Sequence, residues 1–142
     1  MTLKPIKILL IDDSEADIFF TKHLFKKHNI TNQIDAVHDG ETAIRFLQEN
    51  LIKNNLPDII LLDINMPRTN GKDVLNFIKS SDEFKHINVI MLSSSQLEGD
   101  VLNTYKLDAD GYIMKPIDID EFYSVIKKMD TFKYTISKII SA

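Results

Sequence analysis

Three aspartates follow short apolar runs and could together hold a metal ion. Asp12 and Asp13 come directly after residues 8–11, and Asp63 comes after residues 59–62. Carboxylates gathered at one edge of a sheet repel one another unless a cation lies among them. Mg²⁺ needs only two or three protein oxygens, with water completing its shell. The sequence therefore predicts a magnesium site, with helix capping by Asp12 or Asp13 as the alternative.

A lysine and three serines follow two other apolar runs. Lys115-Pro116 comes after residues 111–114, and Ser93-Ser94-Ser95 comes after residues 89–92. An ammonium is a point charge suited to an anion, phosphate in particular. The alternative for Lys115 is an ordinary surface lysine. A lysine placed beside the carboxylates indicates chemistry on a phosphoryl group.

The elements that must position these residues alternate along the chain. Wholly apolar runs are typical of strands buried on both faces of a parallel sheet. Helices with apolar stripes follow them, and Ser14 and Asp39 are candidate N-caps. This order predicts a doubly wound α/β fold, a five-stranded parallel sheet with helices on both faces. Strands are expected at 8–11, 33–37, 59–62, 89–92 and 111–114, and helices at 15–27, 41–49, 72–80, 97–107 and 120–129.

Two pairs of adjacent aromatic residues lie in predicted helices. They are Phe19-Phe20 in the first helix and Phe122-Tyr123 in the last. Neighbouring positions on a helix point in different directions. We therefore expect one member of each pair to face the core and the other to be partly exposed.

The composition restricts the classes of function. The 142 residues suit one domain, and the absence of cysteine excludes disulfides, thiol nucleophiles and cysteine-ligated metals. A net charge of −4 argues against nucleic-acid binding. Neither a signal peptide nor an apolar run of membrane-spanning length is present. A cytoplasmic protein without a membrane or nucleic-acid partner is expected.

Taken together, the strand-ending residues resemble the receiver domain of bacterial response regulators, over about residues 6–129. This resemblance implies the flavodoxin-like receiver fold. The resemblance is specific because the matching residues follow the predicted strands in the order typical of the family. Two segments, 63–67 and 82–85, are similar to stand-alone regulators served by phytochrome-type kinases. The resemblance is carried by Leu10-Ile11-Asp12-Asp13, Asp39-Gly40-Glu41-Thr42-Ala43, Asp58-Ile59-Ile60-Leu61-Leu62-Asp63-Ile64-Asn65-Met66-Pro67, Gly71, Met91-Leu92-Ser93-Ser94 and Gly111-Tyr112-Ile113-Met114-Lys115-Pro116.

The family's chemistry implies a role for each matching residue. Asp63 would accept a phosphoryl group from the phosphohistidine of a sensor histidine kinase. Asp13 and the backbone carbonyl of Asn65 would bind Mg²⁺ beside Asp63, and Asp12 would act largely through a metal-bound water. Lys115 would pair with the phosphoryl oxygens. The protein would then be a phosphoacceptor in signalling, with no enzyme activity beyond its own phosphorylation and dephosphorylation.

Two further residues resemble the family's switch. Ser93, where the family often has threonine, would hydrogen-bond the phosphoryl group once it has formed. Tyr112 would then change rotamer and reshape the surface that a downstream protein binds. The resemblance also implies a cis peptide bond between Lys115 and Pro116, the kind of bond at which cis is accessible.

Two other functions remain open. A Mg²⁺-dependent phosphatase with an aspartyl-phosphate intermediate would carry a second acid two residues after the nucleophile, where this chain has Asn65. A receiver-like adaptor could act without phosphorylation, although the matched site residues argue against it. The kinase, its input signal and the downstream target are not identified by the sequence.

The chain after the receiver domain, residues 131–142, has its own pattern. Apolar residues recur at spacings of three and four at Phe122, Val125, Met129, Phe132, Ile136 and Ile139. Such heptad spacing predicts that the last helix continues from about Ile119 to Ile140. Its exposed stripe would favour a homodimer through this C-terminal helix. The alternative is a tail that turns near Asp130 and folds back on residues 1–130.

Overall fold

One parallel sheet forms the centre of the computed structural model, which describes residues 4–66, 70–94, 109–129 and 134–135. Its strands are β2 (Ile8–Ile11), β3 (Ile34–Val37), β4 (Ile59–Asp63), β5 (Asn88–Ser93) and β6 (Gly111–Met114), all paired in parallel. Their spatial order is β3-β2-β4-β5-β6, so the order reverses between β2 and β4. The predicted five-stranded parallel sheet is confirmed.

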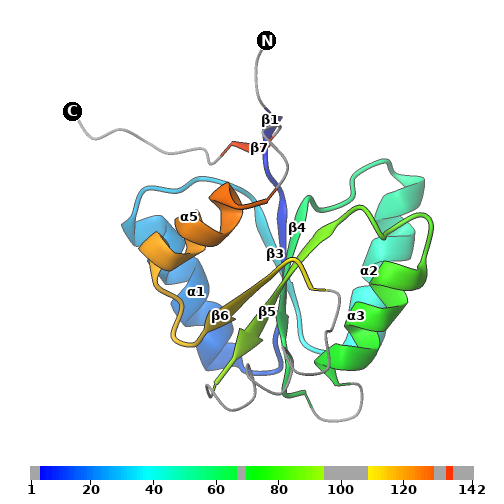
Figure 1. The fold of residues 1–142 in the computed structure, drawn as a ribbon, viewed down its shortest axis with the longest axis horizontal. Helices are drawn as coiled ribbons and strands as arrows, with labels where there is room; N and C mark the ends of the chain where they lie inside the picture. Colours follow the sequence, from blue (N-terminus) through cyan, green and yellow to red (C-terminus); the bar gives the residue numbers. More distant parts are fainter. Residues whose placement is uncertain (1–3, 67–69, 95–108, 130–133, 136–142) are drawn as a thin grey trace.

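Helices cover both faces of the sheet. In Figure 1, α1 (Glu15–Lys27) and α5 (Ile119–Lys127) lie on one face, and α2 (Gly40–Ile52) and α3 (Gly71–Ser80) lie on the other. This arrangement confirms the doubly wound fold. The helix predicted at 97–107 lies outside the described residues. None of the helices within the described ranges has the length and hydropathy that a membrane span requires.

The central strands are buried on both faces, which explains why their sequences are wholly apolar. Leu9 and Ile11 of β2 pack with the cluster under α2 and α3. Ile8 and Leu10 point the other way, into the cluster under α1 and α5. Alternate residues of a strand point to opposite faces, so a strand between two helical layers needs apolar side chains throughout.

Side-chain caps begin the helices at the carboxyl edge of the sheet. The Ser14 hydroxyl accepts a hydrogen bond from the Asp17 backbone N–H at 3.2 Å. The Asp39 carboxylate accepts one from the Thr42 N–H at 2.7 Å. Both predicted caps are confirmed, and they fix the start of α1 and of α2 directly after β2 and β3.

The aromatic pair on α1 differs from the prediction. Phe19 is 72% exposed and Phe20 is 44% exposed, so neither faces the core. The buried residues of α1 are Ile18, Thr21 and Phe25, a stripe spaced by three and four that leaves both phenylalanines outside it. The second pair behaves as predicted, with Phe122 buried and Tyr123 partly buried.

The predicted continuous C-terminal helix is wrong. α5 ends at Lys127, and Tyr134–Thr135 instead form β7, which pairs in parallel with β1 (Lys4–Pro5). The apolar positions Phe122 and Met129, assigned to the heptad stripe, are buried in the core of their own domain. Heptad spacing therefore reflected packing within the domain in this part of the tail. Phe132, Ile136, Ile139 and Ile140 lie outside the described residues.

Candidate functional site

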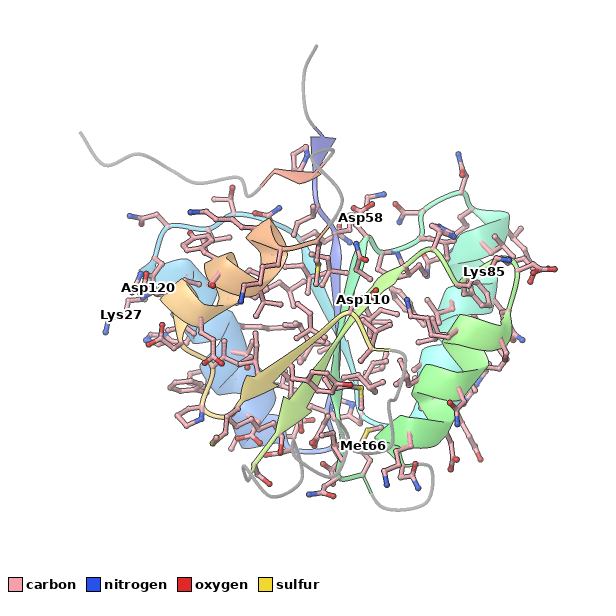
Figure 2. The ribbon with its side chains drawn as sticks, viewed as in Figure 1. Lys27, Asp58, Met66, Lys85, Asp110 and Asp120 are labelled. Carbon is pink, nitrogen blue, oxygen red and sulfur yellow. The ribbon has the colours of Figure 1, made fainter. Side chains whose placement is uncertain are left out.

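The acidic residues meet at the point where the strand order reverses. Asp12 directly follows β2, and its backbone N–H donates to the Val37 carbonyl oxygen at 3.1 Å. Asp63 is the last residue of the adjacent strand β4. Figure 2 shows Asp58 and Met66, which precede and follow β4, at opposite ends of the sheet. Sites in open α/β sheets form at the carboxyl end of such a reversal.

Asp12 is almost completely buried, with 1% of its surface exposed. Its Oδ1 accepts a hydrogen bond from the Ser14 backbone N–H at 2.9 Å. Its Oδ2 lies 2.8 Å from Lys115 Nζ but has no hydrogen-bond partner among the described residues. Because Ser14 is the N-cap of α1, helix capping does not account for Asp12.

Three carboxylates come close enough to share one cation. Oxygen atoms of Asp12, Asp13 and Asp63 lie within 4.8 Å of one another, with Asp13 exposed and the other two buried. Hard divalent cations take carboxylate oxygens as ligands. The buried Asp12 Oδ2 that lacks a hydrogen-bond partner is the kind of atom that a metal ion would satisfy. The residues present therefore fit Mg²⁺.

The Asp63 side chain is held on two sides. Its Oδ1 accepts a hydrogen bond from the Asn65 backbone N–H at 3.1 Å, and its Oδ2 lies 3.3 Å from Lys115 Nζ. The pKa of the Asp63 carboxyl is raised to about 6, because burial and the nearby Asp12 charge raise it by more than the Lys115 charge lowers it. The ordinary value is 3.8, so the charged nucleophile is destabilised without a metal ion.

Lys115 joins the cluster from the end of β6. Its backbone N–H donates to the Ser93 carbonyl oxygen at 2.7 Å, and the peptide bond to Pro116 is cis, as predicted. Its Nζ contacts Asp12, Asp63 and also Asp17, at 3.0 Å from Asp17 Oδ2. Burial alone would lower the pKa of the Lys115 ammonium, but the surrounding carboxylates raise it above its usual range. Lys115 is therefore a fixed positive charge rather than a surface lysine.

Asp17 is the site residue that the sequence reasoning missed. It lies in the first turn of α1, and it belongs to none of the motifs that indicated the site. The contact that matters joins Asp17 to Lys115, which lies 98 positions later in the chain.

The two predicted switch residues lie on neighbouring strands. Ser93 is the last residue of β5 and is buried, in register with Met114 of β6. Tyr112 of β6 is partly buried and packs against the cluster under α2 and α3. Both lie on strands that end at the carboxylate cluster. Their roles in switching stay a prediction.

The arrangement suits group transfer to a carboxylate. A buried carboxylate, Asp63, lies beside a fixed cation and beside two further carboxylates able to hold a metal ion. The Lys115 charge, together with a metal ion bound by the carboxylates, would stabilise the charge that develops on a transferring phosphoryl group.

Comparison with known proteins agrees with this geometry. The family model of the response regulator receiver domain matches residues 8–127. The response regulator Rcp1 of Synechocystis is 32% identical over 130 residues, which cover 90% of this chain and 88% of Rcp1. A structure of the Mn²⁺-bound form of Rcp1 superposes with a TM-score of 0.68 and covers 96% of this chain and all of that one.

Regulators associated with phytochromes are also similar to this chain. The bacteriophytochrome response regulator AtBRR has a TM-score of 0.80 and 30% identity, covering 91% of this chain and 95% of its own. The phosphorylated cyanobacterial phytochrome response regulator RcpA has a TM-score of 0.70 and 31% identity, covering 91% and 94%. These likenesses confirm the resemblance to stand-alone regulators of this kind.

Both the fold and the sequence point to the same family. The matched segment begins at the start of β2 and ends with α5, and it includes every residue of the carboxylate cluster together with Lys115. The chain belongs to the family of response regulator receiver domains.

Proposed function

We propose that this receiver domain accepts a phosphoryl group on Asp63 from the phosphohistidine of a sensor histidine kinase. The proposal rests mainly on the position of the Asp63 carboxylate, which is buried between Lys115 at 3.3 Å and the carboxylates of Asp12 and Asp13. An Asp63 oxygen would attack phosphorus, forming an O–P bond while the histidine N–P bond breaks. Regulators named for phytochromes are among the relatives, which supports a phytochrome-type kinase as the phosphoryl donor. A cytoplasmic location is part of the same proposal.

Each residue of the cluster has a separate task in this proposal. Asp12, Asp13 and Asp63, with the Asn65 carbonyl, would hold Mg²⁺, which when bound neutralises phosphoryl charge. Lys115 would pair with a phosphoryl oxygen from the other side. The backbone N–H of Asn65 orients Asp63 through the 3.1 Å hydrogen bond to Oδ1. The Mn²⁺-bound form of the relative Rcp1 supports a divalent cation here.

The test is phosphorylation of the full chain by acetyl phosphate, followed by intact-mass spectrometry. With Mg²⁺ present, we expect one phosphate per chain, and with EDTA we expect almost none. The adduct should be released by hydroxylamine, as an acyl phosphate is. No uptake with Mg²⁺ would contradict the proposal and favour the phosphorylation-independent adaptor. Repeated turnover of a phosphate ester would instead favour the phosphatase.

The switch gives a second prediction. The Ser93→Ala variant loses the hydroxyl that would bond to the phosphoryl group, but it keeps Asp63, Lys115 and the acidic cluster. We expect phosphorylation to proceed while the response of Tyr112 weakens, because a ligand shifts an equilibrium only through differential contacts. NMR spectra of the beryllofluoride complex measure this response. A full wild-type shift pattern around Tyr112 in the variant would show that the hydroxyl is not the switch.

The homodimer is a further prediction, now without the continuous helix on which it was based. The full chain and a chain ending at Asp130 should differ in oligomeric state if residues 131–142 carry the contact. Light scattering at tens of micromolar, with and without phosphorylation, measures the mass of each. A full-length monomer in both states would contradict dimerisation.

A further inference from the structure

Lys115 lies among three carboxylates, and one of them is outside the candidate metal cluster. Its Nζ is 2.8 Å from Asp12 Oδ2, 3.3 Å from Asp63 Oδ2 and 3.0 Å from Asp17 Oδ2. The contact with Asp17 has hydrogen-bond geometry, whereas Asp12 Oδ2 has no hydrogen-bond partner among the described residues. The ammonium therefore directs an N–H toward Asp17.

A divalent cation in the cluster would change the balance of these contacts. The cluster comprises Asp12, Asp13 and Asp63, which include two of the three partners of Lys115. Coordination would neutralise their charge, and a cation beside an ammonium repels it. With the metal bound, Lys115 would be attracted less strongly to the site. Phosphoryl transfer needs the ammonium charge near Asp63 in that same metal-bound state. Asp17, which does not belong to the cluster, keeps its full attraction.

Asp17 is suited to act as this anchor. Its backbone N–H is bonded to the Ser14 cap, which fixes the first turn of α1. Its side chain is 47% exposed, so it reaches Lys115 from the rim of the site rather than from the buried carboxylates. Asp17, Phe20 and Lys115 also line the same surface hollow between α1 and the segment after β6. The contact therefore joins a fixed helix turn to the end of β6.

We infer that Asp17 is a positioning residue that keeps the Lys115 ammonium beside Asp63 when the metal cluster is occupied. The effect of Asp17 on phosphorylation rests on the proposed function, whereas the contact between Asp17 and Lys115 does not. Asp17 lies outside the cluster of Asp12, Asp13 and Asp63, and it would act through Lys115. Without it, the ammonium would be free to move away from the phosphoryl oxygens.

The kinetic test uses Asp17→Asn, which keeps the shape of the side chain and removes its charge. We expect the phosphorylation rate by acetyl phosphate at saturating Mg²⁺ to fall about tenfold, as misplacement of a catalytic group does. The Mg²⁺ concentration for half-maximal rate should change less than about threefold, because Asp17 is not a ligand. Asp17→Glu restores the charge and should recover most of the rate.

Glu15→Gln is the matched control. Glu15 lies in the same first turn of α1 and its removal also deletes one negative charge near the helix N-terminus, but it pairs with His38. This variant should keep the wild-type rate. Equal losses in Asp17→Asn and Glu15→Gln would show a general charge effect and overturn the inference. A wild-type rate in Asp17→Asn would overturn it as well.

An NMR measurement on the unphosphorylated chain tests the contact without any phosphoryl transfer. With saturating Mg²⁺, the Lys115 ammonium protons should be protected from exchange with water in the wild type and in Asp17→Glu. The protection should disappear in Asp17→Asn. An unchanged ammonium signal in Asp17→Asn would overturn the inference. If the wild type took up no phosphate, the proposed function would fail, while this signal would still decide the role of Asp17.

Discussion

Asp63→Asn will abolish uptake of phosphate by the full chain. The amide has the size of the carboxyl group but no charged oxygen to attack phosphorus, so the O–P bond cannot form. We expect intact-mass spectra of this variant to show no phosphate under conditions that give one per chain in the wild type. Asp12, Asp13 and Lys115 remain in place, so loss of the site's architecture would not explain the result.

Asp58→Asn is the matched control for this change. Asp58 precedes β4 at the other end of the sheet, where its carboxylate accepts a hydrogen bond from the Lys7 N–H at 2.8 Å (Figure 2). This variant should be phosphorylated like the wild type. A phosphate that persists in Asp63→Asn would assign the nucleophile to another residue.

The same substitution should also stabilise the metal-free protein. Burial raises the Asp63 pKa from 3.8 to about 6, so the native state binds this proton more tightly than the unfolded state. The free energy of unfolding therefore falls as pH rises through this interval. Asparagine does not titrate, and Asp63→Asn should be more stable than the wild type by about 1–3 kcal/mol at pH 7 in EDTA. Urea unfolding at pH 4 and pH 7 measures the difference, and equal pH dependence in both proteins would contradict it.

Gly71→Ala should damage both the fold and the site. A Cβ at position 71 would lie 2.4 Å from the Asp63 carbonyl oxygen and 2.9 Å from Ile64 Cα. Both are backbone atoms, so the strain cannot be relieved by turning a side chain. The loop after β4 would have to move away from α3, and the Asp63 carboxylate with it. We expect a loss of about 1–3 kcal/mol in the free energy of unfolding and a phosphorylation rate lower by about a hundredfold.

Gly111→Ala separates these two effects. A Cβ at Gly111 would meet Val125 Cγ1 at 2.6 Å, a side-chain atom that can turn away. Gly111 is the first residue of β6, whereas Lys115 follows its last residue. Urea unfolding should show a loss of stability, while mass spectrometry should show a rate near that of the wild type. If Gly71→Ala lost stability yet kept its phosphorylation rate, the close approach of α3 would not control Asp63.

The strand ends explain why much of the site could be predicted from sequence. Wholly apolar runs identify strands buried on both faces, and parallel strands bring their carboxyl ends to one edge. Asp12 and Asp63 follow such runs and Lys115 follows the last predicted strand, so their meeting follows from topology. Lys115 Nζ lies 2.8 Å from Asp12 and 3.3 Å from Asp63, which bears this out.

Features that depend on how a helix is rotated or where it ends were not predictable in the same way. The Asp17–Lys115 contact depends on the position of α1 relative to the end of β6, which no local pattern encodes. Phe19 lies beside the buried Ile18 in the sequence, yet the rotation of α1 about its axis places Phe19 on the exposed side. The apolar spacing around Met129 describes a helix face equally well whether a partner or the domain itself covers it.

The hollow between α1 and Lys115 also offers a position for an intrinsic fluorescent reporter. The chain contains no tryptophan, and Phe20 lines this hollow together with Lys115 while being 44% exposed. An indole introduced at position 20 would be the only one in the molecule, so its fluorescence would report on this spot alone. Movement of the ammonium, binding of a cation or arrival of a phosphoryl group could then be followed in real time, without a dye and without isotopes.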